Sequence, residues 1–166
     1  MPGSDPVGGD PPSSRLIVDC ARLEAGAVDC IEVSRRCLLA DSGVPGARVL
    51  DGLVEVEATL RKAAAAYLAV GRVRGTWAAE CRRCLEEVRG LLEAPFEEVF
   101  EWSPLEGETW PIRDQRIDLA PASHQAAVLS LPLAPLCSPG CAGPDPERFP
   151  TGPAAELPPK ADAADV

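Results

Sequence analysis

Two close pairs contain four of the chain's seven cysteines, and both pairs stand where turns are expected. The four residues are Cys81, Cys84, Cys137 and Cys141. Two thiolates separated by two or three residues can bind one metal ion from a tight turn, so the two pairs together predict a tetrahedral Cys₄ zinc site. Because the pairs are far apart in the sequence, they can share one ion only if the tertiary fold brings them together. Cys20, Cys30 and Cys37 have no partner at ligand spacing, which predicts ordinary small apolar side chains.

The net charge of −10 opposes simple nucleic-acid binding, because Lys and Arg carry phosphate contacts. The charge is unevenly distributed, however. Basic residues concentrate between positions 61 and 89, whereas residues 93–108 contain several Glu and no basic residue. Guanidinium groups bind phosphate oxygens in a bidentate manner, so we expect the arginines of the basic region to contact a nucleic acid or a partner. The predicted contact residues are Arg72, Arg74, Arg82 and Arg83. A solvated surface of uneven charge is the alternative interpretation.

The sequence predicts a cytoplasmic protein with no membrane partner. No stretch approaches the roughly 18 consecutive apolar residues of a membrane span, and Met1 is followed by Pro2 and Gly3 rather than by a basic and then an apolar region. In the cytoplasm, an odd number of cysteines argues against a disulfide framework and leaves metal binding or burial.

The sequence carries none of the catalytic motifs considered below in complete form, which predicts no enzyme and no small-molecule substrate. The single histidine, His124, has neither the second histidine of a metalloprotease helix nor the Glu that follows two residues later in zinc deaminases. No glycine-rich loop is followed by the Lys-Ser/Thr that binds phosphates. A thiol oxidoreductase centred on Cys81-Arg82-Arg83-Cys84 remains a third possibility, although its flanking strand patterns differ from a thioredoxin-like βαβ unit.

Alternating apolar and polar residues predict an α+β fold, namely a mainly antiparallel β-sheet or partly open barrel with a short late helix and two cysteine knuckles. Strands are expected over residues 15–23, 53–60, 67–75 and 88–100. Gly71 and Gly75 suggest a turn or bulge, and Pro95 marks an edge or bulged strand. The helix opens near Asp118 and Pro121. Pro-, Gly- and Ala-rich composition predicts disordered tails over residues 1–14 and 143–166, around one domain over 15–142.

Two segments resemble the motifs of a known family. Cys81-Arg82-Arg83-Cys84-Leu85 is similar to the C-x-R-C-L signature of the YceD family, the bacterial large ribosomal RNA subunit accumulation proteins. Ile117-Asp118-Leu119 and residues 131–137 resemble the hydrophobic-D-L and L-P-x-x-P-x-C segments of the same family, and Cys141-Ala142-Gly143 continues the match. The likeness extends over about residues 53–143.

The resemblance implies a non-enzymatic ribosome biogenesis factor that supports synthesis, processing or stability of the large-subunit (23S) rRNA. Its partner would be a large-subunit rRNA precursor or a ribosomal protein. The alternative is a zinc-stabilised interaction module that binds a basic ribosomal protein through residues 93–108 without RNA contact. Many relatives carry a further C-x-x-C where this chain has Asp145 and Arg148. The sequence therefore leaves two possibilities open: four ligands still bind zinc, or the cysteines only pack.

Overall fold

A computed structural model describes residues 13–39, 43–145 and 147–148 of the chain. The predicted tails, residues 1–14 and 143–166, lie mostly outside these described residues. The strands are β1 (Ile17–Asp19), β2 (Ile31–Leu38), β3 (Gly43–Val44), β4 (Ala47–Ala63), β5 (Ala66–Glu80), β6 (Glu87–Glu101), β7 (Trp110–Pro111) and β8 (Arg116–Asp118). The helices are α1 (Ala21–Glu24) and α2 (Ala120–Leu129). Neither helix in the described part of the chain has the length and apolar character that a bilayer crossing requires.

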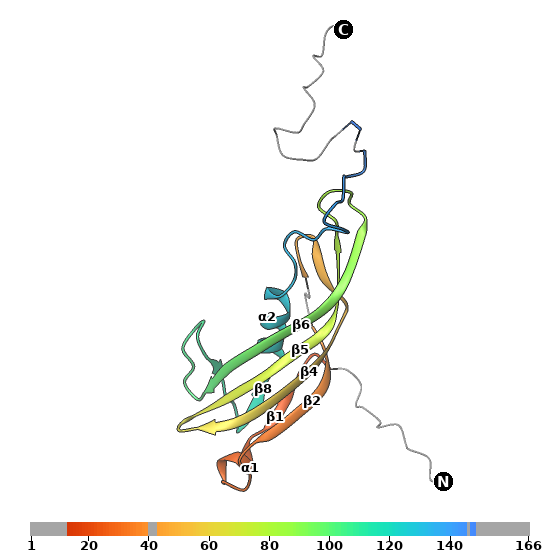
Figure 1. Ribbon diagram of the computed structural model, residues 1–166. Coiled ribbons are helices and arrows are strands. Elements are labelled where there is room, and N and C mark those ends of the chain that lie inside the picture. The colour runs from red at the N-terminus through yellow and green to blue at the C-terminus, as the bar shows by residue number, and fades with distance from the viewer. Residues whose placement is uncertain (1–12, 40–42, 146, 149–166) are drawn as a thin grey trace, which may run out of the picture.

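The long strands β4, β5 and β6 form the centre of a twisted open sheet, and α2 packs against one of its faces (Figure 1). This 6-stranded sheet has the order β2-β4-β5-β6-β7, with β3 added beside β4. Its long strands pair in antiparallel fashion, and only the short β7 runs parallel to its neighbour β6. A separate 2-stranded sheet joins β1 to β8. The prediction of a mainly antiparallel α+β fold is confirmed, and the sheet stays open rather than closing into a barrel.

Period-two alternation explains which face of the sheet is buried. In β4 the side chains of Val54, Val56 and Leu60 point into the core, whereas Glu55 and Glu57 point away from it. Successive side chains of a strand point to opposite faces, so this pattern turns one row of apolar residues toward the core, which α1, α2 and the β1–β8 sheet complete. The buried row continues across β5 and β6.

The glycines of β5 do not mark a turn or bulge, so that prediction is wrong. The strand runs without interruption through Gly71 and Gly75, and the irregularity instead lies in β4, between Val49 and Val54. A Cβ atom at Gly71 would lie only 2.3 Å from the carbonyl oxygen of Glu57. Gly71 is therefore required for the close approach of two strands, a role that sequence patterns do not distinguish from a bulge.

Near the N-terminus the expected strand over residues 15–23 is only partly correct. Strand β1 ends at Asp19, whose side-chain Oδ1 accepts a hydrogen bond from the backbone N–H of Ala21 at 2.8 Å. This bond turns the chain into α1, which buries Leu23 from a helix rather than from a strand. The late helix and the edge position of β6 are confirmed: Pro95 lies where β6 pairs with β5 alone, and β7 joins it only from Phe100 onward.

Candidate metal centre at the hairpin tip

The first cysteine pair lies at the tip of the hairpin that joins β5 to β6. The backbone N–H of Cys81 donates to the carbonyl oxygen of Glu86 at 2.8 Å, and the N–H of Leu85 donates to the carbonyl of Cys81 at 2.9 Å. These two bonds close a compact turn that contains Cys84. Leu85 completes the turn with a φ of 65°, in the left-handed region that residues other than glycine rarely adopt.

The second cysteine pair reaches the same tip from the far end of the sequence. After α2 the chain runs along the molecule and lies beside the β5–β6 turn (Figure 1). There the backbone N–H of Arg82 donates to the carbonyl oxygen of Pro135 at 3.0 Å. A turn between Cys137 and Cys141 follows, closed by a 3.1 Å bond from the Cys141 N–H to the carbonyl of Ser138.

The four thiols lie close enough together to hold one metal ion. Their sulfur atoms all lie within 4.8 Å of one another. The Cys81 and Cys141 sulfurs are 3.8 Å apart, and those of Cys84 and Cys137 are 3.7 Å apart. A zinc–sulfur bond of about 2.3 Å in a regular tetrahedron places neighbouring sulfurs about 3.8 Å apart. The structure thus brings together all four residues predicted as ligands, and the Cys81–Cys141 and Cys84–Cys137 separations match those of a zinc tetrahedron.

Burial and hydrogen bonding divide the four thiols into an inner and an outer pair. Cys81 and Cys141 are buried, Cys84 is half-buried and Cys137 is exposed. Backbone N–H groups of Cys84, Arg83 and Cys137 point at the Cys81 sulfur and lower the pKa of its thiol to about 6. A backbone hydrogen bond from Glu86 lowers the pKa of Cys84, but burial and the neighbouring thiols outweigh it and raise that pKa to about 12.

This arrangement suits metal ligation better than thiol redox chemistry. A catalytic thiolate must be accessible to its substrate, whereas Cys81 is fully buried beneath its neighbours. The pair also lies in the turn of an antiparallel hairpin, not at the start of a helix after a parallel strand. Backbone N–H groups aimed at sulfur stabilise a thiolate, which is the form that zinc binds.

The remaining cysteines lie outside the centre. Cys20 and Cys37 are buried in the core, as predicted for small apolar residues, and Cys30 is half-buried. Burial, with a smaller contribution from Asp19 and Glu24, raises the pKa of Cys20 to about 11.

Arg82 and Arg83 attach the second cysteine loop to the hairpin. The Arg83 guanidinium donates through Nη1 to the carbonyl oxygen of Cys141 at 2.7 Å and to that of Pro139 at 3.4 Å. The Arg82 guanidinium donates to the carbonyl of Leu133 at 3.2 Å. Both side chains, predicted to contact phosphate, therefore already bind the backbone of the loop that carries Cys137 and Cys141.

Arg72 and Arg74, the other predicted contact residues, lie farther along β5 in a network of ion pairs. Arg72 Nε and Arg74 Nη1 lie 2.7 and 3.3 Å from one carboxylate oxygen of Glu57, and Arg74 Nε lies 3.5 Å from Glu93. The strand rises about 3.3 Å per residue, so Arg72 is roughly 30 Å from Arg82. The four arginines do not form one patch.

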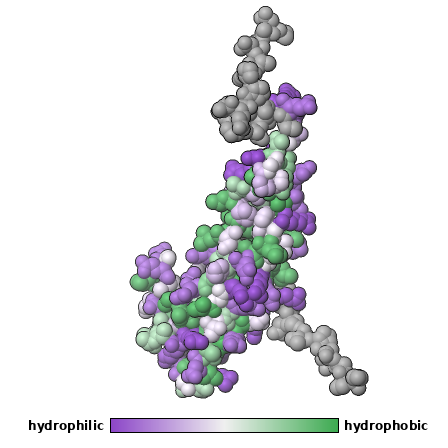
Figure 2. Space-filling model, viewed as in Figure 1, coloured by the Kyte–Doolittle hydropathy of each residue, from purple (hydrophilic) through white to green (hydrophobic). Residues whose placement is uncertain are grey.

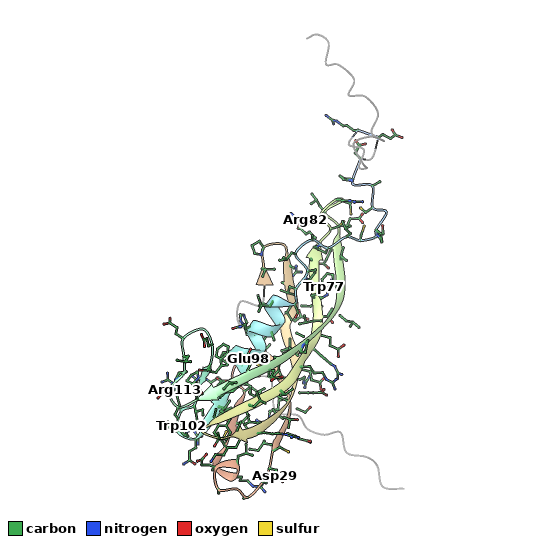
Figure 3. The ribbon with its side chains drawn as sticks, turned by 60° about the vertical axis from the view of Figure 1, so that its left-hand side comes forward. Asp29, Trp77, Arg82, Glu98, Trp102 and Arg113 are labelled. Carbon is green, nitrogen blue, oxygen red and sulfur yellow. The ribbon has the colours of Figure 1, made fainter. Side chains whose placement is uncertain are left out.

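The acidic segment, residues 93–108, runs toward the end of the molecule opposite the cysteine tip. Figure 3 places Trp102 and Glu98 at that end and Arg82 at the other. Trp102 and Leu105 are exposed there. Among the described residues, Glu93 is the only carboxylate of the segment in a salt bridge. The fold thus separates Arg82, at the cysteine tip, from the far end of the acidic segment, whereas Arg74 in the middle of β5 pairs with Glu93.

Sequence reasoning missed two exposed leucines at the cysteine tip, Leu85 and Leu133. Leu85 directly follows the first cysteine pair, and Leu133 lies shortly before the second. A large apolar residue in a predicted turn is the signal that could have identified Leu85.

Comparison with known proteins places this centre in a family. Uncharacterized proteins of Mycobacterium bovis and Mycobacterium tuberculosis are 30% identical to the chain over 98 residues, which is 55% of this chain and 47% of theirs. The alignment thus spans about half the length of these curated relatives. No solved structure matched significantly. The family model described as "Large ribosomal RNA subunit accumulation protein YceD" matches residues 69–156, which include all four clustered cysteines. The chain belongs to the YceD family.

Proposed function

We propose that the chain is a non-enzymatic ribosome biogenesis factor that supports accumulation of the large-subunit (23S) rRNA and acts in the cytoplasm. The observation that carries this proposal is the family match over residues 69–156, within which the hairpin tip and its four thiols lie. The role in rRNA accumulation comes from the description of the family. The matched mycobacterial relatives are named only as uncharacterized proteins.

The cysteine centre supports a structural rather than a catalytic role for its metal. When bound, zinc would link the β5–β6 turn to the 137–141 loop through Cys81, Cys84, Cys137 and Cys141. A catalytic zinc site keeps one position free for water or substrate, whereas four thiols fill a tetrahedral site. The chain's own contribution is to hold two segments, distant in sequence, as one rigid tip.

Deletion of the gene that encodes the chain tests the proposed function directly. In cells that encode it, we expect deletion of its gene to lower the ratio of large-subunit to small-subunit rRNA. The wild-type chain and a Cys30→Ser variant should restore the ratio, because Cys30 lies outside the cysteine cluster. A Cys84→Ser/Cys137→Ser variant should restore it poorly. An unchanged ratio after deletion would refute the proposed function.

The metal is tested separately on purified protein. Elemental analysis should find one equivalent of zinc in the wild-type chain and in Cys30→Ser, and none in Cys84→Ser/Cys137→Ser. A metal-free chain with an equally stable tip would mean that the cysteines only pack. This measurement is independent of the rRNA ratio, so either proposal can fail alone.

Direct RNA contact through the predicted arginines can be measured by binding to purified large-subunit precursors at increasing salt. Phosphate contacts make the logarithm of the affinity fall linearly with the logarithm of salt concentration. Arg72→Gln/Arg74→Gln should then reduce that slope. Arg83→Gln is a poor probe, because its side chain also holds the Cys141 loop.

A second candidate function is suggested by which charged side chains are already in salt bridges. Arg72 and Arg74 pair with Glu57 or Glu93, whereas Glu106 and Glu108 have no salt bridge among the described residues. This pattern favours an interaction module that holds a basic ribosomal protein on the acidic segment. Glu106→Lys/Glu108→Lys would then abolish the capture of that protein, while Arg72→Gln/Arg74→Gln would leave it intact.

A further inference from the structure

The two cysteines on the outer side of the cluster form a pair that spans both segments of the tip. Cys84 belongs to the β5–β6 turn and is half-buried, whereas Cys137 belongs to the second cysteine loop and is exposed. Their sulfur atoms lie 3.7 Å apart. The inner pair, Cys81 and Cys141, is buried, with exposed fractions of 0% and 8%. The cluster therefore offers a small solute one accessible pair of thiols and withholds the other.

Access decides which of these thiols can react with an oxidant. Oxidation of cysteine follows thiolate character and exposure, and zinc binds all of its cysteine ligands as thiolates. The sulfur separations in the two pairs are nearly equal, 3.7 and 3.8 Å, so distance does not distinguish them and burial does. At this end of the molecule the face drawn in Figure 2 mixes hydrophilic and hydrophobic residues, which suits the approach of a small polar oxidant.

The inner pair is also held in place by backbone contacts. The N–H of Cys137 donates to the Cys81 sulfur at 3.4 Å, and the Arg83 guanidinium binds the Cys141 carbonyl at 2.7 Å. A Cys81–Cys141 disulfide would disturb these bonds. A Cys84–Cys137 disulfide requires the two sulfurs to approach by about 1.7 Å, because the bonded distance is about 2.05 Å. Cys137 lies on an exposed loop, where rotation of its side chain can provide this movement.

We propose that Cys84 and Cys137 are an oxidant-sensitive pair, which peroxides convert into a disulfide that keeps the tip closed once the metal has left. The inference rests on the proposed zinc centre for the release of the metal. The pairing of the thiols depends only on their positions and their exposure. The buried thiols Cys81 and Cys141 would remain reduced, so the change is reversed by a thiol reductant.

Two displacements account for the atoms and electrons of this reaction. The Cys137 thiolate attacks one oxygen of the peroxide, so that an S–O bond forms, the O–O bond breaks and hydroxide leaves. The Cys84 thiolate then attacks the Cys137 sulfur, so that the S–S bond forms, the S–O bond breaks and a second hydroxide leaves. The two thiolates lose two electrons and the peroxide gains them. A zinc ion would then retain only two of its four ligands, which a chelator can displace.

The new bond would join the same two segments as the metal. It connects residues 53 positions apart in the sequence, one in the hairpin turn and one in the second cysteine loop. A covalent cross-link restricts the open state of the segments that it joins and so favours the closed one. Peroxide would thus exchange one link for another rather than open the tip.

The test treats the full purified chain with an equimolar amount of hydrogen peroxide, alkylates the remaining thiols and maps the disulfides by mass spectrometry. Trypsin cleaves after Arg82 and Arg83, which separates Cys81 from Cys84. The second pair stays in one peptide, residues 117–148, and fragment ions within residues 138–140 show which of its cysteines is alkylated. The Cys84–Cys137 disulfide should exceed every other pairing about 10-fold, because burial protects the other thiols.

Two double variants are matched, because each removes two ligands and with them the metal site. Cys81→Ser/Cys141→Ser keeps the outer pair and should form the cross-link as readily as the wild type. Cys84→Ser/Cys137→Ser keeps the inner pair and should form a disulfide about 10-fold more slowly. Cys30→Ser, outside the cluster, should leave the product unchanged.

Two further measurements follow the metal and the tip. A chromogenic chelator should record zinc release in step with disulfide formation. Hydrogen exchange in residues 81–86 and 131–141 should stay slow in the oxidised, chelated chain and become fast again after reduction.

The inference is overturned if the main disulfide is Cys81–Cys141 or lies within one loop, or if the outer thiols become sulfinic acids without a cross-link. It is also overturned if the oxidised, chelated tip exchanges as fast as the reduced, chelated one. A chain that purifies without zinc would refute the metal centre alone, since the disulfide map still decides the pairing. The rRNA ratio after gene deletion is a separate measurement, so failure here leaves the proposed function standing.

Discussion

With zinc bound as proposed, removal of the metal should open the hairpin tip and leave the sheet folded. The buried apolar cluster that stabilises the sheet includes Val56, Leu60 and Phe100 but not Cys81 or Cys141. The cysteine centre therefore lies outside the main core. Proteins open locally in cooperative units of differing stability, and the tip meets the criteria for a separate unit.

The magnitude follows from the bonds that hold the tip. Apart from the thiols, the 133–141 segment is attached by one backbone bond to Arg82 and by guanidinium bonds from Arg82 and Arg83. Such bonds contribute about 0.5–1.5 kcal/mol each, or about 1.5–3 kcal/mol when one group is charged. These contributions must also offset the conformational entropy of ordering the segment, about 1–2 kcal/mol per residue, so the metal-free tip is only weakly held. Zinc at a free concentration of a thousand times its Kd adds about 4 kcal/mol, equivalent to roughly a thousandfold slower amide exchange.

Hydrogen exchange with mass spectrometry, with zinc and after chelation, measures this difference segment by segment. Peptides covering residues 81–86 and 131–141 should exchange up to roughly a thousandfold faster without metal, whereas those covering 54–60 should be unaffected. Cys137→Ser should reproduce the fast exchange in the presence of zinc, and Cys30→Ser should not. Equal loss of protection in tip and sheet, or a tip indifferent to the metal, would refute the reasoning.

Two further predictions concern the sheet. Gly71→Ala should destabilise the protein by about 1–3 kcal/mol in urea unfolding, because the new methyl group would meet the Glu57 carbonyl at 2.3 Å. Gly75→Ala should be nearly neutral. The new methyl group would lie 3.2 Å from a Val54 side-chain carbon and 3.3 Å from the Leu53 carbonyl oxygen, which requires only small shifts of these neighbours. Equal effects at both glycines would contradict the strand packing. Hydrogen bonds from Tyr67 and then Lys62 lower the pKa of Glu24, so its contribution to stability is complete above its ordinary carboxyl pKa and is lost as pH falls through the lowered value. Tyr67→Phe should therefore flatten the acid side of the stability–pH curve, and an unchanged slope would contradict the Tyr67–Glu24 bond.

The long strands were predictable from a local rule, and the meeting of the cysteines was predicted as what a shared Cys₄ site would require. Alternation in β4 and β6 reports the buried face directly, since the side-chain period of a strand is two. The cysteine pairs have ligand spacing within each turn, and a Cys₄ site can close only if the turns meet. Neither inference needs to know which strand lies next to which.

The roles of glycine and arginine were not predictable because their partners come from elsewhere in the chain. Gly71 is explained by the approach of Glu57 and Ala58 across the β4–β5 pair. Arg83 is explained by carbonyl groups of the second cysteine loop, more than fifty positions later in the sequence. The basic composition around residues 61–89 was real, but composition does not reveal which guanidinium groups are already bound.

The central strands are so long that charges at the cysteine tip and charges on the acidic segment act independently of one another. Strand β5 has 15 residues, so the cysteine tip and the Trp102 end are separated by roughly 50 Å. At physiological salt the screening length is only about 8 Å, so charges at one end do not affect binding at the other. Shared partners would have to span the whole sheet to touch both surfaces. One compact partner segment therefore contacts either the cysteine tip or the acidic segment, and variants at the two ends distinguish these cases.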